Sequence, residues 1–331
     1  MTHEKTCSLA MHFRSIADLP PAQIAQAEKA LGAARRRAGA VVEINAAGQQ
    51  RACPRCGSTH RARWGSTRAG AQRWRCKGCS GHWTGRSGTP LVGVHRPGLF
   101  IEVARNMLDT NEVPLSCRKL GRRLGLSRDT IWRWRMMILA QLKAAPVPVL
   151  SGIVETDDTA QRESRKGSRE WVRHERDPSQ PKPPRRRWHE YSKSKPPQAI
   201  AYRWSEPILG VVDRTGRASF QYTKNMRQAT LDAALTPQIA PDAMVLFDEA
   251  PQYEAVARAR SLSFRVLVAG RRSARTPQAF HLNGVNAPHA QWKEISKAWR
   301  GPATKHLDGY ARWLAARRDG DPLALFRAII T

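Results

Sequence analysis

The chain has 331 residues, which is more than one ordinary domain needs, so we expect two or three folded units. Hydrophobic residues make up 41% of it, which is enough to build real cores and excludes wholesale disorder. There are 56 Lys and Arg residues against 27 Asp and Glu, a formal net charge of +29, and a folded chain with that charge repels itself unless a polyanion is present.

Residues 1–20 contain no apolar signal core, and no stretch of the chain reaches 18 consecutive apolar residues. These observations predict neither export nor membrane spanning, so we expect a cytoplasmic protein. No long amphipathic basic helix is visible either, which disfavours a membrane surface as the partner. Nucleic acid is therefore the expected polyanion, and a ribosome-associated role is one alternative.

The first half of the chain reads as three consecutive segments. Residues 1–49 form an N-terminal helical segment, because apolar side chains recur at helical spacing over 17–39. Residues 50–90 form a short, turn-rich unit that contains four of the six cysteines. Residues 91–148 are helical again and end in a proline-rich break at 144–148. We therefore place a domain boundary between residues 148 and 149.

The cysteines of the turn-rich unit have the spacing of a structural zinc site. Two C-x-x-C pairs, separated by 19 residues, supply four thiolates from two tight turns, as tetrahedral zinc requires. The predicted ligands are Cys53, Cys56, Cys76 and Cys79. Trp64 and Trp74 are expected to cover the small core, and His60 and His82 are spare ligands that a complete shell does not need. Redox dithiols or accidental matches are the alternatives to this zinc ribbon.

Residues 115–138 have the pattern of a helix-turn-helix. Leu120 and Leu124 face the core of a first helix, Gly125 fits the turn, and Ser127 is placed to cap a second helix. Ile131 of that second helix points inward. Four residues are expected to point outward and bind DNA: Arg128, Thr130, Arg133 and Arg135. The alternative is an ordinary helical hairpin with a basic, solvated face.

Beyond residue 148 the pattern changes to a mixed α/β order. Strands are expected at 153–154, 208–212, 218–222, 244–247 and 264–268. Helices are expected at about 227–235 and 251–260, and a helical region at about 288–328. Between the first two strands, the basic and proline-rich stretch 162–197 has the composition of a solvated loop or a DNA-contacting arm.

Carboxylates follow two of these strands in a chain that has few acidic residues. Asp157 and Asp158 follow the first strand, and Asp248 and Glu249 follow the fourth. Carboxylates on adjacent strands can hold two divalent cations about 4 Å apart, which together activate an attacking hydroxyl and stabilise the leaving oxygen. Magnesium suits this chemistry because it prefers oxygen ligands and keeps waters for a substrate phosphate. A single acid after a strand is more often a helix cap or a surface group, so either one alone assigns no site.

The whole set of motifs resembles a bacterial insertion-sequence transposase family that has an N-terminal zinc ribbon and a DDE-type catalytic domain. The similarity includes the cysteine pairs, the helix-turn-helix, a G-T-P segment within 83–90, and V-E-T-D-D-T at 154–159. It implies a multidomain α+β protein with a ribonuclease-H-like mixed α/β catalytic domain over 149–331. It also implies Asp157 and Asp248 as the first two catalytic acids, with Asp158 where Glu is usual and Tyr253 at the customary distance from Asp248.

The third catalytic position departs from the family's common pattern, N-x-x-E-x-x-W. In the corresponding run 286–292, His289 takes the place of the Glu. Neutral imidazole can bind a divalent metal, although it binds magnesium less well than a carboxylate does. The resemblance therefore implies His289 as the third catalytic and metal-binding residue, with Glu294 or a degenerate site as alternatives. Lys293 and Lys297 are plausible phosphate contacts nearby.

These patterns together predict a DNA transposase that binds terminal inverted repeats through the ribbon and the helix-turn-helix. With magnesium or manganese bound, it would hydrolyse a phosphodiester at the element's end, and the freed 3′-hydroxyl would attack target DNA. Because two ends must be paired, we expect a homo-oligomer on double-stranded DNA in the bacterial nucleoid. The alternatives are a relict regulator that binds DNA without cutting it, a nuclease or resolvase on the same fold, and an RNA-processing protein.

Overall fold

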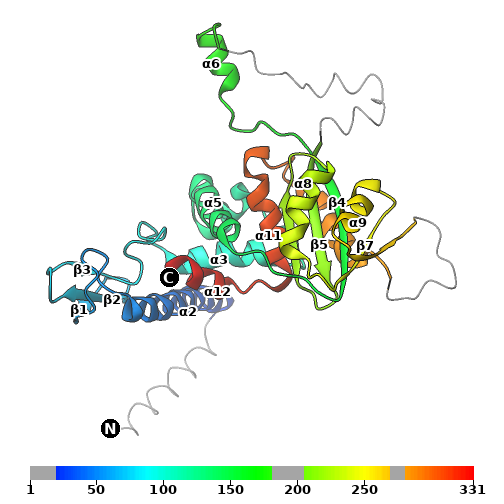
Figure 1. Ribbon diagram of the computed structural model, residues 1–331. Coiled ribbons are helices and arrows are strands. Elements are labelled where there is room, and N and C mark those ends of the chain that lie inside the picture. Colours follow the sequence, from blue (N-terminus) through cyan, green and yellow to red (C-terminus); the bar gives the residue numbers. More distant parts are fainter. Residues whose placement is uncertain (1–19, 181–204, 269–279) are drawn as a thin grey trace. The chain divides into compact units, whose positions relative to one another are not determined.

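The computed structural model describes residues 20–180, 205–268 and 280–331 of the chain (Figure 1). The chain divides into two compact units, and each is described by itself. The first unit contains the residues up to Arg105 together with Asp321–Thr331, and the second contains Asn106–Gly320. None of the helices in the described ranges is long and apolar enough to cross a membrane.

Helix α2, Pro21–Gln50, is the first element of the first unit. It begins at a proline, which is favourable because the first turn of a helix leaves its N–H groups unpaired in any case. Its buried residues, from Ala40 to Gly48, all lie in its second half. The helix predicted over 17–39 therefore continues to Gln50, and residues 17–19 lie outside the described residues.

Three short strands follow α2: β1 (Arg61–Ser66), β2 (Gln72–Cys76) and β3 (His82–Trp83). They form an antiparallel sheet in that order, and Trp74 pairs with Trp83. Helix α3, Pro97–Leu108, begins in this unit. The last helix, α12 (Pro322–Ile330), packs on α2, where Arg327 lies 3.5 Å from Glu43. The C-terminal residues thus belong to the first unit.

The second unit contains a pair of helices, α4 (Cys117–Leu124) and α5 (Arg128–Ala144). Gly125 ends α4 with φ = 63°, a left-handed conformation that glycine adopts without the steric cost of a side chain. Ser127 caps α5, because its side chain accepts a hydrogen bond of 3.1 Å from the N–H of Thr130. Leu120 and Ile131 are buried, and Leu124 is partly buried. The local sequence signals for turn and cap therefore give the expected backbone.

The second unit also contains a five-stranded mixed sheet in the order β6-β5-β4-β7-β8. The strands are β4 (Ile153–Arg162), β5 (Ser205–Asp213), β6 (Ala218–Tyr222), β7 (Met244–Phe247) and β8 (Ser263–Val266). The β4–β5 and β5–β6 pairs are antiparallel, whereas β4–β7 and β7–β8 are parallel. All five strands expected from the sequence are present, and the mixed α/β class is confirmed.

Helices cover both faces of this sheet. On one face, α8 (Gln228–Leu235) and α9 (Pro251–Ala259) pack over a core that includes Val154, Val211 and Phe247. On the other, α10 (Asn283–Ala298) packs on β4 and β5, and α11 (Leu307–Asp319) packs on β6. A short helix, α6 (Glu170–Arg176), lies in the described part of the basic stretch 162–197, and residues 181–197 lie outside the described residues.

Helices α4 and α5, which precede residue 148, and the sheet after it belong to one compact unit, although we placed a boundary between residues 148 and 149. The reason is α11, which packs on both α5 and β6. Trp313 of α11 donates a 2.9 Å hydrogen bond to the carbonyl oxygen of Met107, and Arg317 donates one of 3.0 Å to the same oxygen. A sequence break such as the prolines of 146–148 does not reveal such long-range packing.

Candidate active site and metal centre

The carboxylates of β4 lie on opposite faces of the sheet, because side chains alternate between the two faces along a strand. Val154 lies in the core beneath α8 and α9, whereas the buried Glu155 accepts a hydrogen bond from a backbone N–H of α10. Asp157 therefore shares the α10 face with Glu155, and Asp158 shares the other face with Val154. Consistently, the hydroxyl of Tyr253 in α9 donates a 3.2 Å hydrogen bond to Asp158.

His289 of α10 lies over Asp157. Its Nδ1 is 3.8 Å from Oδ2 of Asp157, which is too far for a direct hydrogen bond. The His289 side chain is buried, and its Nε2 has no hydrogen-bond partner within the described residues. The structure thus brings together two of the residues predicted from the sequence. Glu294, the alternative, is exposed on α10 and makes no ion pair with a described residue at this site.

Gly210 of β5 makes the room that His289 occupies. It pairs with Asp157 in the sheet, and a Cβ at this position would lie 2.8 Å from Nε2 of His289 and 2.6 Å from the ring of Phe220. Both contacts are closer than real Cβ atoms make. A glycine inside an apolar strand is a signal for the close approach of another group. Gly210 in the apolar run 208–212 was therefore a sequence signal for this close approach, although it was not among the predicted site residues.

Asp248 follows β7 on the same face as Asp157. The parallel register pairs Leu246 with Glu155, and continuing it by two residues sets Asp248 beside Asp157. Burial, and then the charges of Asp157 and Glu249, raise the pKa of Asp248. On the opposite face of β4, burial and then the charge of Asp157 raise the pKa of Asp158 to about 6. The carboxylates of Asp157 and Asp158 therefore repel that of Asp248. The first two lie inside β4 rather than after it, because the strand expected at 153–154 continues to Arg162.

This donor set fits a divalent cation. Two carboxylates and an imidazole are hard or borderline ligands, and a cation between them would relieve the repulsion that raises the pKa of Asp248. Within the described residues, however, only the four cysteines have ligand atoms that all lie within 4.8 Å of one another. Asp157, Asp248 and His289 are thus more widely spaced than the thiols.

The first turn of α10 is anchored by Glu155. One carboxylate oxygen accepts a 3.0 Å hydrogen bond from the N–H of Val285, and the other pairs with Arg214 and lies 3.4 Å from Nδ1 of His281. Gly284 permits this approach, because a Cβ there would lie 2.9 Å from the carboxylate. An anion at a helix N-terminus also interacts favourably with the helix dipole. Glu155 therefore holds the helix that carries His289.

Pro288, directly before His289, lies inside α10. A proline has no N–H, so the carbonyl oxygen of Gly284, four residues earlier, loses its usual helical partner. Nη1 of Arg318 in α11 donates a 3.1 Å hydrogen bond to that oxygen instead. The helix is thus held at both Gly284 and Val285, which limits the movement of His289 relative to Asp157.

Glu155→Gln should destabilise the second unit by roughly 1–3 kcal/mol and lower any activity that depends on His289. The substitution keeps the shape but removes the charge that pairs with Arg214 and attracts the α10 N-terminus, and hydrogen bonds to charged groups contribute about that much. The free energy of unfolding in urea would measure the effect. Glu254→Gln is the matched control, because Glu254 forms only an exposed pair with Arg258 on α9. Equal effects of the two substitutions would contradict the anchoring role.

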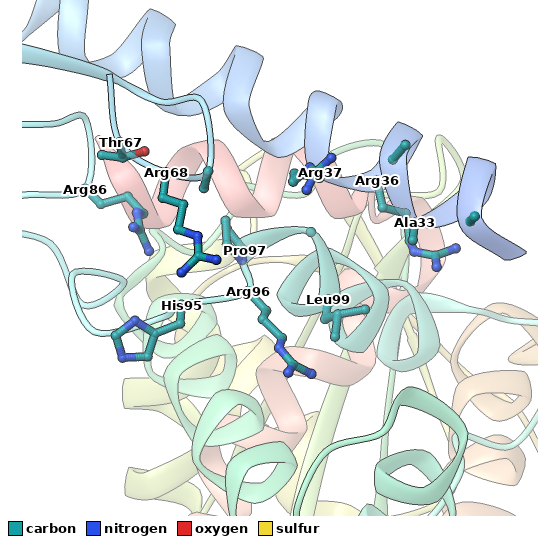
Figure 2. Close-up of a pocket in the computed structure, with 14 residues that line it drawn as sticks. Ala33, Arg36, Arg37, Thr67, Arg68, Arg86, His95, Arg96, Pro97 and Leu99 are labelled. Atoms are coloured by element: carbon teal, nitrogen blue, oxygen red, sulfur yellow. The ribbon is translucent and has the colours of Figure 1, made fainter. Parts of the chain in front are cut away.

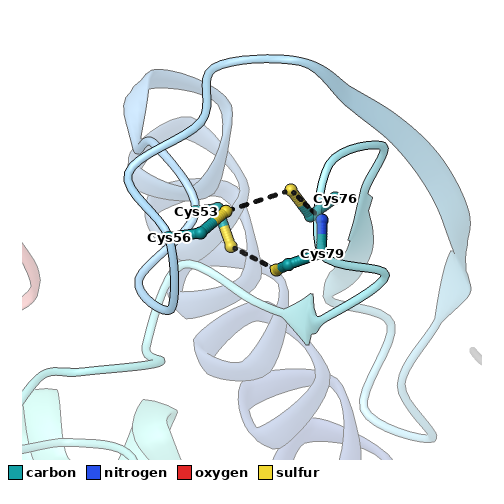
Figure 3. Close-up of side chains that lie close together, drawn as sticks. All are labelled: Cys53, Cys56, Cys76 and Cys79. Carbon is teal, nitrogen blue, oxygen red and sulfur yellow. Dashed lines mark hydrogen bonds between the residues drawn. The ribbon is translucent and has the colours of Figure 1, made fainter.

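The second candidate site is the group of four cysteines in the first unit (Figure 3). The Sγ atoms of Cys53 and Cys79 are 3.6 Å apart, as are those of Cys56 and Cys76. Backbone N–H groups, first that of Cys79 and also that of Gly78, lower the pKa of Cys76 to about 6, although burial opposes this. Four converging thiols with backbone N–H donors suggest zinc as the metal that they would bind.

The small core beside the cysteines differs in one residue from the expectation. Trp74 is buried against the cysteines as expected, but Trp64 is 46% exposed and lies against His82 and Arg75 instead. Trp83 of β3 takes the predicted place of Trp64 and is 2% exposed. The reason is strand alternation: Trp74 and Trp83 are paired in register, so they face the same side of the sheet.

Of the four residues expected to face outward from α5, Arg135 does not. Arg128 and Arg133 are exposed and Thr130 is partly exposed, whereas Arg135 is 2% exposed. Arg135 donates hydrogen bonds to Asn106 and to the carbonyl oxygen of Leu115, and its guanidinium lies 5.1 Å from the ring centre of Trp299. It is four residues after Ile131, so it shares the buried face of the helix.

Comparison with known protein families places these residues in context. Residues 149–319, more than half of the chain, match the ISXO2-like transposase domain. The chain belongs to the ISXO2-like transposase family. In this ISXO2-like transposase the matched range contains β4, β7 and α10, and hence Asp157, Asp248 and His289. A comparison with curated proteins found no match. Membership supports a DNA-processing enzyme and implies DNA as the partner.

Proposed function

We propose that this protein is a DNA transposase that cleaves and joins strands at a site formed by Asp157, Asp248 and His289. The observation that carries the proposal is the placement of Asp157 inside β4, next to the parallel strand β7 that Asp248 follows, with His289 of α10 turned toward Asp157, inside the matched transposase domain. The strand order β6-β5-β4-β7-β8 also supports a ribonuclease-H-like fold, which the family resemblance implies.

Asp157 and Asp248 would hold magnesium or manganese, and His289 would complete the site through Nδ1, the ring nitrogen that faces Asp157. The bound metal would supply Lewis-acid activation of the attacking water or 3′-hydroxyl and stabilisation of the leaving oxygen. Glu155 and Gly210 act through His289: the first holds its helix and the second leaves room for its ring. They are positioning residues.

A basic cavity beside the proposed site suits a DNA strand. It has a volume of about 1060 Å³ and is lined by the end of β4 and by α10. Its cationic residues are Arg162, Lys293, Lys297 and Arg300, and Glu163 is the acid that lines it. Because Lys293 and Lys297 follow His289 at four-residue intervals, the three side chains lie along one side of α10. We infer that the two lysines contact successive phosphates on one side of the reacting bond.

We propose that two further regions of the chain also bind DNA. We propose that α4 and α5 form a helix-turn-helix whose exposed Arg128, Thr130 and Arg133 contact the element's end, Arg135 having a structural role. The four cysteines would bind zinc and fold the strands β1 to β3 as a zinc ribbon. Recognition of two ends would require at least two protomers.

The decisive experiment is magnesium- or manganese-dependent cleavage and joining of a duplex that carries the end of the flanking element. Joined products would support a transposase, and cleavage without joining would indicate a nuclease or resolvase. Specific binding without any nicking by the wild type would contradict catalysis. It would favour a relict regulator, for which the histidine in place of the family's third acid is the motivating observation.

DNA affinity should fall steeply with salt, and Arg133→Gln should reduce that dependence. Each arginine–phosphate contact releases a counterion, so losing one lowers the slope of log K against log salt by about 1. Fluorescence anisotropy with a labelled duplex at several salt concentrations measures both quantities. Arg258→Gln, at an exposed, ion-paired arginine of α9, is the control. A flat salt response of the wild type would count against any role in DNA binding.

A further inference from the structure

The first unit contains a basic cavity that the proposed function does not use (Figure 2). It has a volume of about 1000 Å³ and is lined by α2, by the turn between β1 and β2, and by the start of α3. The residues of positive or titratable character that line it are Arg36, Arg37, Arg68, Arg86, His95 and Arg96, and no acidic residue lines it. We call this the arginine pocket.

Close backbone packing brings these arginines together from separate segments. Gly98, in the first turn of α3, lies so near α2 that a Cβ there would be 2.8 Å from the carbonyl oxygen of Arg36 and 3.1 Å from the nitrogen of Arg37. Arg96 is therefore held beside Arg36 and Arg37. Figure 2 shows Arg68 and Arg86 extending from the other side toward the start of α3. The fold thus lines one cavity with positively charged side chains from several segments.

The positive charge of the arginine pocket is not balanced by acidic side chains in the part of the chain that the structure describes. None of the five arginines forms an ion pair with a described residue. Burial lowers the pKa of Arg86, and the Nε atoms of both Arg36 and Arg86 are buried without a hydrogen-bond partner among the described residues. A buried donor left without an acceptor is energetically unfavourable. An anionic ligand would supply acceptor oxygens and negative charge to these arginines.

The chemistry of the pocket favours phosphate groups on an extended chain. All five cationic side chains are arginines, whose planar forks bind phosphate oxygens in pairs and with more directional specificity than lysine. The amino-terminal end of α3 adds partial positive charge. Ala30, Ala33 and Ala34 of α2 also line the pocket, and their small side chains leave it open to a large ligand. The volume of the pocket exceeds what one free phosphate fills.

We propose that the arginine pocket binds the sugar-phosphate backbone of duplex DNA, as a contact separate from α5 and from the active site. The proposal rests on the proposed function in that it takes DNA as the partner. It assigns α2 and the start of α3 to DNA binding. The contact would be independent of base sequence, because phosphate and sugar groups are the same at every base pair.

The test measures the affinity of the full-length, zinc-bound protein for a labelled DNA duplex. Three variants are compared with the wild type: Arg36→Gln, Arg68→Gln and Arg96→Gln. Each substitution should weaken binding roughly threefold to tenfold, equally for an element end and for unrelated DNA, and lower the salt slope by about 1. Arg86 is left intact because it also donates to the carbonyl oxygens of Leu91 and Val94. Arg258→Gln is the matched control, and unchanged zinc content and thermal unfolding would show that the variants fold.

Wild-type affinity and salt slope in all three variants would overturn the proposal, whatever the activity of the enzyme. So would unchanged DNA binding combined with lost binding of inorganic phosphate, which would indicate a site for a small anion, or a loss confined to an RNA duplex of the same sequence. Failure of the proposed function has a different signature: the wild type would show no metal-dependent cleavage, while the pocket variants would still lose DNA affinity.

Discussion

Asp157→Ala should lower metal-dependent strand cleavage by about 10³-fold or more. Metal ions contribute several kcal/mol of transition-state stabilisation in such reactions, and each 1.36 kcal/mol corresponds to a factor of ten in rate. Asp157 shares its strand face with Glu155 and lies 3.8 Å from His289, so it is the residue on which both the metal and the imidazole depend. The measurement is single-turnover cleavage of an end-bearing duplex in magnesium and in manganese.

Two comparisons make this result specific. Asp242→Ala removes an exposed carboxylate just before β7, at the strand end opposite to Asp248, and should leave cleavage unchanged. Asp157→Ala should not destabilise the fold, because the hydrogen bond found for Asp157 is a local one, from the N–H of Asp158. Cleavage by Asp157→Ala at the wild-type rate would rule out the proposed site.

The same assay separates the candidates for the third ligand. His289→Ala should lose cleavage activity, as Asp157→Ala does, because His289 is buried against Asp157. Glu294→Ala should retain activity, because Glu294 is exposed. The reverse pattern would move the third role to Glu294. Full activity in both variants would mean that another group completes the site.

Cys76→Ser should abolish zinc binding and unfold the strands β1 to β3. The local core of this sheet consists of Trp74, Trp83 and the cysteines themselves, which is too little apolar surface to fold so short a unit alone. Structural zinc in comparable small domains contributes on the order of 10 kcal/mol or more, so loss of one thiolate should exceed what the remaining contacts can offset.

Zinc content after dialysis and the near-ultraviolet circular dichroism of the tryptophans would report the change. Cys117→Ser is the control, because Cys117 lies in α4 and is not among the four clustered thiols. Retention of stoichiometric zinc by Cys76→Ser, with native circular dichroism, would exclude a four-cysteine zinc site.

The sequence alone determined the features that depend on short spacings. Each C-x-x-C pair places two thiols in a single turn, and the spacing of the two pairs predicted the cluster of four thiols that the structure contains. Gly125 and Ser127 predicted a turn and a cap, since a left-handed residue and an N-cap hydroxyl act within a few residues of themselves. The five strands could be predicted from apolar runs. Asp248 follows its strand as expected, whereas Asp157 lies inside β4, because pairing with β5 extends that strand to Arg162.

Only the tertiary structure decided which side chains face one another. Strand alternation separates Asp157 from its neighbour Asp158, but the packing of α10 and α9 decides which of the two meets His289 and which meets Tyr253. Arg135 looks like an outward residue in the sequence and is buried because Asn106, Leu115 and Trp299 surround its face of α5. Glu155 meets the N–H of Val285 across 130 residues of chain. Such pairings arise from long-range packing, which the periodicity of one segment does not encode.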